Sequence, residues 1–412
     1  MGMAHEFILV PVGWGFMGIH AFGGDIVAVT DGGSMPGCFS VSRQVLEQVI
    51  NKLLNKLGIG QWTWFLSHFD YDHYSLTLDL IEQKWPVPRY VILPASYSYD
   101  ACREALAMYF ALAYLIAGRL GLSFIRVKKL YEKLSEFMSK GSIIYGVVAG
   151  NRIVLNGVVY HVIWPEENYV RKSCGKLIRA IRKKIDKVCK GDKKCKERVE
   201  DVMRGVRSRL DGFGVRRVES RVLEIPLGER AVGGEGREDS KINDAEASSS
   251  RFLSVYEVYE VGADRLGDRE LLAIHKSVVN LHSLAYVVEG RVGDHVHANS
   301  VNIENFYPYC HYDFNDRYVV MYLGDLDGDE LNKALRNARD AGVYYVNVLV
   351  APHHGNAVVS STGNVPCSRF TYIPRCDEHV EFSWRKNLNR AWLMGSIPII
   401  SNHSGLLRVW VH

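Results

Sequence analysis

Three familiar sequence features are missing from this chain of 412 residues. The eight cysteines include no CxxC pair, which argues against a zinc ribbon and a secreted disulfide framework. The longest helical apolar run, residues 105–118, is roughly six residues short of a bilayer span, so we expect a buried helix there. The N-terminus lacks the pattern of a secretory signal. These absences favour a cytoplasmic protein with no membrane partner.

Glutamine is also scarce, with four residues, whereas Arg, Val, Tyr and Glu are abundant, as is typical of thermophile proteins. Intracellular disulfides occur in some of these proteins, so Cys189 and Cys195 could pair across the short turn between them. Two free thiols are nevertheless the expected state. Hydrophobic residues make up 47% of the chain, which is enough for a substantial core and excludes general disorder.

Positive charge is concentrated in one segment. Between Arg171 and Arg198, thirteen Lys or Arg residues stand against three Asp or Glu, although the net charge of the whole chain is only +4. Such a segment would attract a polyanion, and Lys183, Lys184 and Lys187 are the predicted nucleic-acid contacts. The alternative is a solvated helix face, because the basic residues alternate with a regular apolar stripe.

Strand and helix patterns alternate over residues 1–165 and again over 271–412, which predicts an α/β fold with functional residues at strand ends. The first half would contain a helical insertion at about residues 97–140. Residues 166–270 would form a basic helical hairpin and then a flexible segment rich in Gly, Ser and charge. Helical spacing predicts further helices at residues 41–57, 74–85, 328–342 and 384–395.

A short apolar strand leads into the stretch HFDYDH, residues 68–73, which crowds two His and two Asp into six positions. In an extended loop His68 and Asp70 would project to the same side, whereas Asp72 and His73 would diverge. That geometry suits two neighbouring divalent metal ions, each bound by one imidazole and one carboxylate. A polar surface loop is the alternative.

The second half supplies similar side chains at strand ends. Asp325 follows an apolar strand, where a carboxylate could bridge two metal ions. Asp327 and Asp329 are expected to be helix-start carboxylates. His353 and His354 follow the next strand, and neighbours on an extended segment point opposite ways. One of the two should therefore bind metal, and the other could contact an anionic substrate.

Several motifs, taken in order, resemble the metallo-β-lactamase fold. They are HFDYDH, which is similar to the family's HxDxDH variant, an Asp-Gly-Gly turn at 31–33, NLHSLAYVV at 280–288, GD at 324–325, PHHG at 352–355 and SNHSGLLRVWV at 401–411. The pattern is most similar to the C-terminal hydrolase domain of ComEC competence proteins and to bacterial phosphorylcholine esterases. It covers about residues 1–95, 157–165 and 278–412, and implies an αββα sandwich with helical insertions.

The resemblance implies a centre of two divalent ions, zinc or manganese. His68 and Asp70 would serve one ion, while Asp72 and His73 would serve the other and Asp325 would bridge them.

His354 would complete the second ion's ligands, again by resemblance. His353 would contact phosphate or the transition state, so Asp72 and His353 are the candidate catalytic residues. Asp31 would lie close to the site without binding metal, or would have a role only in the Asp-Gly-Gly turn.

One departure from the family concerns the His68/Asp70 ion. The histidine of the family's third motif has no clear counterpart, and Asn280 and Ser283 occupy that strand. The vacant position could be filled by water, by substrate or by His282, and His403 in the closing segment could contact substrate.

The resemblance and the composition together predict a metal-dependent hydrolase of phosphodiester bonds that uses a bridging hydroxide. The basic segment favours a nuclease with DNA or RNA as substrate. A phosphodiesterase for a small or cyclic nucleotide or another phosphate ester would use the same ions but would not need that segment. A thioester or lactone hydrolase is a weaker alternative. From a different class, a non-catalytic nucleic-acid-binding protein could have the same fold.

Overall fold

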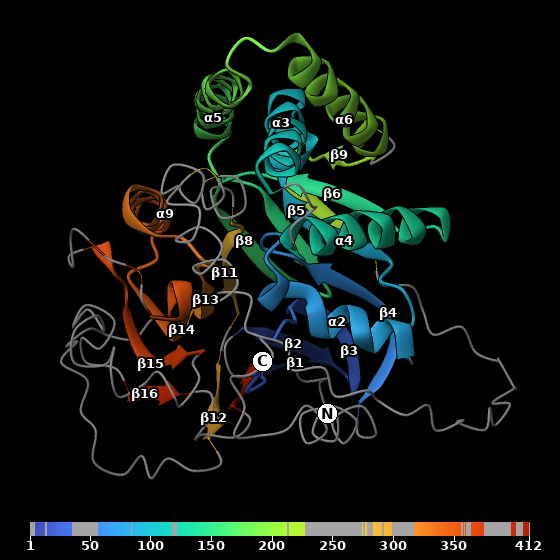
Figure 1. The fold of residues 1–412 in the computed structure, drawn as a ribbon. Helices are drawn as coiled ribbons and strands as arrows, with labels where there is room; N and C mark the ends of the chain where they lie inside the picture. Colours follow the sequence, from blue (N-terminus) through green and yellow to red (C-terminus); the bar gives the residue numbers. More distant parts are fainter. Residues whose placement is uncertain are drawn as a thin grey trace, which may run out of the picture.

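Two mixed β-sheets pack face to face and helices cover their outer faces (Figure 1). The chain is therefore α/β, as its alternating patterns predict. The structure is a computed structural model that describes residues 5–12, 15–34, 57–83, 85–117, 122–211, 214–226, 274, 277, 283–290, 292–298, 317–355, 357, 359, 364–374, 397–400 and 407–411.

The first sheet is ordered β12-β17-β1-β2-β3-β4-β5-β6-β9. Strands β3, β4, β5, β6 and β9 run parallel to one another, so their carboxyl ends meet at one edge. The strands are β1 (His5–Leu9), β2 (Met17–Phe22), β3 (Asp25–Asp31), β4 (Gly58–Phe65), β5 (Tyr90–Pro94), β6 (Ile143–Val147), β9 (Arg216–Arg217), β12 (Val292–Ala298) and β17 (Leu407–Val411).

The second sheet is ordered β10-β7-β8-β11-β13-β14-β15-β16, and its strands β13 to β16 are also parallel. The two halves of the sequence are interlocked: β7 and β8 precede the basic hairpin yet join this sheet, while the C-terminal β17 pairs with β1 in the first. Its strands are β7 (Arg152–Leu155), β8 (Val158–Trp164), β10 (Val222–Ile225), β11 (Ala285–Glu289), β13 (Tyr318–Tyr322), β14 (Tyr345–Val350), β15 (Cys367–Ile373) and β16 (Ile397–Ile400).

An aromatic-rich core fills the space between the sheets. Phe65 of the first sheet stacks on Tyr160 of the second with ring centroids 4.6 Å apart, and Phe16 stacks on Tyr322 at 4.7 Å. Burial of such rings is the main cohesive force between two sheets.

Six α-helices occur in the described residues. One core cluster joins α2, α3 and α4 to the first sheet, and a separate cluster joins α9 to the second. The predicted helical insertion and basic hairpin are both present, and α5 and α6 pack on α3 (Figure 1). The helices are α2 (Tyr71–Gln83), α3 (Asp100–Ala117), α4 (Leu122–Ser139), α5 (Glu167–Cys189), α6 (Lys193–Asp211) and α9 (Gly328–Asp340).

The apolar segment at 105–118 is largely core, as predicted: residues 105–112 of α3 are buried in the cluster beneath the first sheet. Among the described helices, none combines the length and apolar character needed to cross a membrane.

The prediction of free thiols at Cys189 and Cys195 is wrong, because the two residues form a disulfide across the hairpin turn. Lys190 ends α5 in a left-handed conformation, and the resulting tight turn leaves the two Cα atoms 5.5 Å apart. A second disulfide joins Cys102 of α3 to Cys174 of α5. The two helical segments that the sequence treats as separate insertions are thus covalently joined.

Some elements differ from the predictions or lie beyond the described part. Helix α2 begins at Tyr71 rather than near residue 74. The helices predicted at 41–57 and 384–395 and the flexible segment predicted after the hairpin lie almost entirely outside the described residues.

Candidate metal centre

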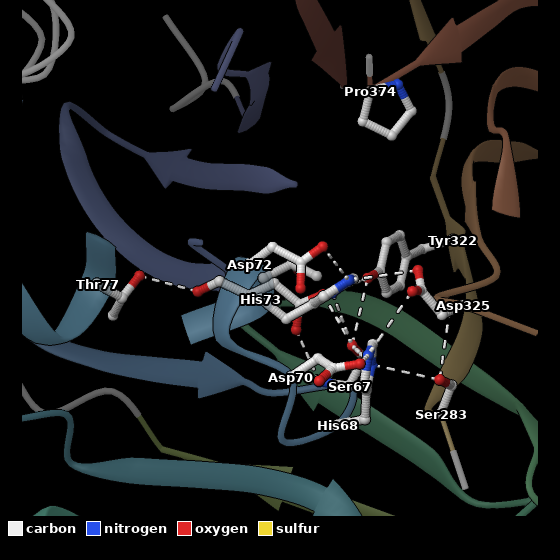
Figure 2. Close-up of polar contacts among 12 residues, drawn as sticks. Ser67, His68, Asp70, Asp72, His73, Thr77, Ser283, Tyr322, Asp325 and Pro374 are labelled. Atoms are coloured by element: carbon white, nitrogen blue, oxygen red, sulfur yellow. Dashed lines mark hydrogen bonds and ion pairs between the residues drawn. The ribbon is translucent and has the colours of Figure 1, made fainter. Parts of the chain in front are cut away.

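Buried His and Asp side chains gather where strand ends of both sheets meet (Figure 2). The first sheet supplies His68 and Asp70 from the loop after β4, and helix α2 supplies Asp72 and His73 from its first turn. The second sheet supplies Asp325 just after β13 and His354 from a turn, η2 (Pro352–Gly355), after β14. The structure therefore brings together six residues that the sequence predicts as ligands.

Two glycines let α2 approach closely enough to present Asp72 and His73. A Cβ on Gly33 would lie 2.0 Å from the carbonyl carbon of Asp72 and 2.2 Å from the backbone nitrogen of His73. Gly32 has φ +106°, and its carbonyl accepts a 2.7 Å hydrogen bond from the backbone of Thr77. The Asp-Gly-Gly turn thus packs against the end of α2 that carries Asp72 and His73.

Asp325 occupies the middle of the cluster. Its Oδ1 lies 3.3 Å from His73 Nε2, while its Oδ2 lies 3.8 Å from His68 Nε2 and 3.9 Å from His354 Nε2. One carboxylate therefore reaches three imidazoles, which is the arrangement a bridging ligand needs.

The remaining ligand candidates fall into overlapping groups. His68, His73 and Asp325 form one group that could hold a metal ion, and Asp72, His73 and His354 form another. His354 Nε2 lies 3.1 Å from Asp72 Oδ2. The second group contains the three residues that the resemblance implies for one ion, and His73 also belongs to the first group.

Asp70 lies at the rim of the cluster. Its Oδ2 is 3.8 Å from His68 Nε2, and 36% of its side chain is exposed. The predicted divergence of Asp72 and His73 assumed an extended loop. In the helix that starts at Tyr71, both side chains instead reach the same centre, with Asp72 Oδ2 3.8 Å from His73 Nε2.

The Nδ1 atom of each imidazole is held away from the centre. His73 Nδ1 donates to Asp31 Oδ2 at 2.7 Å, and His354 Nδ1 donates to the carbonyl of Pro374 at 3.2 Å. Ser67 Oγ gives its own proton to Asp31, at 2.8 Å, and so accepts from His68 Nδ1, at 2.9 Å. A proton on each Nδ1 leaves each Nε2 lone pair directed into the cluster.

Asp31 anchors two of these imidazoles, one directly and one through Ser67. Its fully buried carboxylate accepts hydrogen bonds from the backbone and hydroxyl of Ser67, at 2.7 and 2.8 Å, from His73 and from Tyr322 OH. The backbone φ of Asp31 is 55°, a left-handed value that Asp tolerates better than most residues. Asp31 thus lies close to the site without entering either metal-binding group, as the resemblance implies.

Negative charge is crowded in this centre. Partial burial, and then repulsion from Asp72 and Asp325, raise the pKa of Asp70 to about 7. Burial opposes a charge on His73, but attraction to Asp325, Asp31 and Asp72 outweighs it and raises the pKa of His73 well above its usual value. A cation bound between His73 and Asp325 would displace that proton and offset the carboxylates.

Burial lowers the pKa of His68 to about 4, with repulsion from His73 as the second cause. His68 is therefore neutral near pH 7 and needs no deprotonation to bind metal. The Nε2 atoms of His68 and His73 are both buried, and neither makes a hydrogen bond within the described residues. Two orphaned imidazole nitrogens beside a carboxylate fit a divalent ion well, because burying such atoms without a partner is costly.

His353 and His354 diverge, but not for the predicted reason. They lie in a tight turn, with φ values of 49° and 53°, rather than on an extended segment. His354 enters the cluster, while the Nδ1 of the part-exposed His353 lies 3.8 Å from Asp327 Oδ2. Asp327 is the N-cap of α9 and Asp329 lies in its first turn, as predicted for both carboxylates.

Ser283 lies in the site as predicted. Its Oγ is 3.3 Å from His68 Nδ1 and accepts a hydrogen bond from the backbone of Asp325. Asn280, His282 and His403 lie outside the described residues. Ser67 was missed because its role depends on the meeting of neighbouring strand ends in the first sheet, and Tyr322 because its contact with Asp31 crosses between the two sheets.

The predicted trio of nucleic-acid contacts needs correction. Lys183 and Lys187 are exposed on α5, but Lys184 is buried, with 6% of its surface exposed. Lys184 lies three residues after the core residue Ile181, and so falls on the helix face that packs inward.

No protein-family model matches the chain, and no curated protein matches it. The buried His and Asp groups could hold metal ions, which is compatible with a metal-dependent enzyme.

Proposed function

We propose that this protein is a metal-dependent hydrolase of phosphodiester bonds, with nucleic acid as its substrate and a site of the metallo-β-lactamase type. The observation that carries the proposal is the anchoring of three imidazoles through Nδ1, which aims the Nε2 atoms of His68, His73 and His354 at shared carboxylates. Metal sites commonly fix their histidines in this way.

The residues that would hold two divalent ions, zinc or manganese, are His68, Asp70, Asp72, His73, Asp325 and His354. Bound there, the ions would lower the pKa of water and offset the charge that develops at phosphorus. The chain's own task is to keep the ligands in place. Asp31 does so by accepting hydrogen bonds from both loop and helix, and Asp325 by reaching all three imidazoles.

Two features support a phosphodiester rather than another ester. The HxDxDH-type motif resembles the phosphodiesterase branch of the fold family, and His353 stands at the rim of the cluster with 22% of its side chain exposed. A histidine in that position can contact a phosphate oxygen without binding metal. Asp327, 3.8 Å from its Nδ1, would orient the ring.

A cleavage assay tests the proposal. The purified protein would be mixed with labelled single- and double-stranded DNA, RNA and bis(p-nitrophenyl) phosphate, in EDTA or with Zn²⁺, Mn²⁺ or Mg²⁺. We expect metal-dependent cutting of a polynucleotide, abolished in Asp72→Asn, which keeps the size of the side chain, and retained in Asp340→Asn at the exposed end of α9.

The other outcomes of the cleavage assay would change the substrate, the activity or the site. Turnover of the small ester alone would keep the site and replace the nucleic acid with a small phosphodiester. No turnover with any metal would refute the hydrolase and favour a non-catalytic binding protein. Unchanged cutting by Asp72→Asn would exclude this cluster as the active site.

A further inference from the structure

Helix α5 carries a continuous row of positive charge on the face opposite its core contacts. At 3.6 residues per turn the members of the row fall within about 80° of one another, and the buried Val170, Cys174, Leu177 and Ile181 lie on the other side. All six members are exposed, and we refer to them as the α5 stripe: Lys172, Lys176, Arg179, Lys183, Lys187 and Lys190.

The stripe is not neutralised by its surroundings. None of its six members forms an ion pair within the described residues, whereas neighbouring basic residues such as Arg171, Lys193 and Lys196 do. An ordinary solvated helix places acidic partners three or four residues from its lysines. Six unpaired cations in one row repel each other, so the row is better explained by an external anion than by stability.

A chain of contacts connects the stripe with the metal centre. Phe69, between His68 and Asp70, stacks on Tyr97 with ring centroids 4.0 Å apart. Two residues later, the ring of Tyr99 lies beneath the guanidinium groups of Arg171 and Arg217, at 4.9 and 5.4 Å from its centroid.

Glu167 holds both of these arginines in place, through contacts of 2.9 Å to Arg171 and 2.6 Å to Arg217. Tyr97 and Tyr99 follow β5, and Arg217 ends β9, so this group lies at the same carboxyl edge of the first sheet as the metal loop. The stripe begins one residue after Arg171 and follows α5 to its turn into α6, at the top of Figure 1.

We propose that the α5 stripe is a docking track for the sugar-phosphate backbone of a polynucleotide, leading to the metal centre past Arg171, Arg217 and Tyr99. From Lys172 to Lys190 the track is about 27 Å long, at a rise of ~1.5 Å per residue. That length matches about eight nucleotides at ~3.4 Å per phosphate along one strand. The binding part of the proposal rests on α5 alone, whereas cutting at the end of the track rests on the proposed function.

An anionic membrane surface is the other partner that a basic amphipathic helix could bind. The apolar face of α5, however, is already buried against α3. The only large apolar residues exposed in the described part of the chain are Val188, Val222 and Tyr344. Because Val188 lies on the side of α5 opposite the stripe, no apolar anchor accompanies these charges.

The test measures binding without catalysis. The full chain in EDTA would be titrated against a labelled single-stranded DNA of about 20 nucleotides, longer than the track, over a series of salt concentrations. Six phosphate contacts predict that log K falls with log salt with a slope of about −4. Lys176→Gln/Lys183→Gln/Lys187→Gln should bring the slope to about −2 and weaken binding roughly 10-fold.

Two control variants separate the track from charge in general. Lys176→Arg/Lys183→Arg/Lys187→Arg keeps the charge and should bind as the wild type does. Lys129→Gln/Lys133→Gln/Lys140→Gln removes the same net charge from α4 and the residue after it. Glu82 and Glu136 already neutralise these lysines, so the slope should stay unchanged.

Binding and turnover fail separately. An unaltered salt slope in the stripe variant, with metal-dependent hydrolysis of bis(p-nitrophenyl) phosphate intact, would overturn the track and leave the hydrolase standing. Normal stripe-dependent binding with no turnover would support the track and refute the hydrolase. Stripe-dependent binding to phosphatidylserine vesicles without binding to DNA would overturn the polynucleotide in favour of a membrane.

Discussion

Asp31→Asn is the sharpest test of how the metal centre is built. The amide has nearly the shape of the carboxylate, and Asn also tolerates the left-handed φ of 55° at this position, so the turn should survive. What changes is the proton arrangement. An amide nitrogen facing His73 Nδ1 donates where the carboxylate accepted, and the imidazole must then move its proton to Nε2, the atom that faces Asp325.

The size of the effect follows from the hydrogen bonds that the Asp31 carboxylate accepts. Replacing the carboxylate that orients a metal-binding histidine typically lowers metal affinity 10- to 100-fold, or about 1.4 to 2.7 kcal/mol. Each charge-assisted hydrogen bond to Asp31 contributes about 1.5–3 kcal/mol, partly offset because Asn removes a buried charge. We therefore expect weaker metal binding together with a lower unfolding free energy of the metal-free protein, because several of these hydrogen bonds are weakened at once.

Isothermal titration calorimetry with Zn²⁺ and Mn²⁺ would measure the affinity, and urea denaturation in EDTA would measure the stability. Asp340→Asn, an exposed carboxylate at the end of α9, is the matched control and should change neither. Wild-type metal affinity in Asp31→Asn would refute the idea that this carboxylate sets the His73 tautomer.

Two further predictions concern the turn and the inter-sheet core. Gly33→Ala should weaken Zn²⁺ binding in calorimetry, because the added Cβ would overlap the backbone of Asp72. Gly60→Ala is the control and should bind Zn²⁺ normally, because a Cβ there meets open space. Equal Zn²⁺ affinities of the two variants would contradict this steric account. Burial, and then repulsion from His5, lowers the pKa of His20 well below 6.5, so the folded state resists a proton that the unfolded state accepts. The unfolding free energy should therefore fall as pH drops below about 6.5. Urea denaturation at several pH values should show that this free energy depends less steeply on pH in His20→Gln, by up to ~1.4 kcal/mol per pH unit. An unchanged pH dependence would exclude His20 as the source.

The sequence predicted which residues meet at the centre better than the local backbone that carries them. Asp325, His354 and the HFDYDH stretch stand at the ends of apolar runs, and strand ends of a sheet converge. The expected divergence of Asp72 and His73 was wrong, because it treated them as residues of an extended loop. An acidic residue in the first turn of a helix is a start signal, so residues 71–73 could have been assigned to α2 from the sequence.

Other contacts could not be predicted from the neighbouring residues in the sequence. Cys102 and Cys174 are 72 residues apart, and only the packing of α3 on α5 brings them together. In the sequence, Tyr322 is one more position of the apolar strand β13. Its contact with Asp31 exists only because the two sheets face each other. Lys184 is the opposite case, since its spacing from Ile181 placed it in the apolar stripe of α5 and its burial was predictable.

The position of the centre couples metal binding to the packing of the two sheets. Asp31 and His73 belong to the first sheet and its helix, whereas Tyr322 and Asp325 belong to the second. The Tyr322–Asp31 hydrogen bond and the His73–Asp325 ion pair cross the boundary. A cation that binds only this arrangement stabilises the folded state by about 2.7 kcal/mol at a concentration 100 times its dissociation constant. Because the ligands come from both sheets, that binding energy opposes the separation of the two sheets rather than the fraying of either sheet. The aromatic core between the sheets already holds them together by burial. A bound ion would therefore add rigidity where the core ends, at the strand ends that carry these side chains.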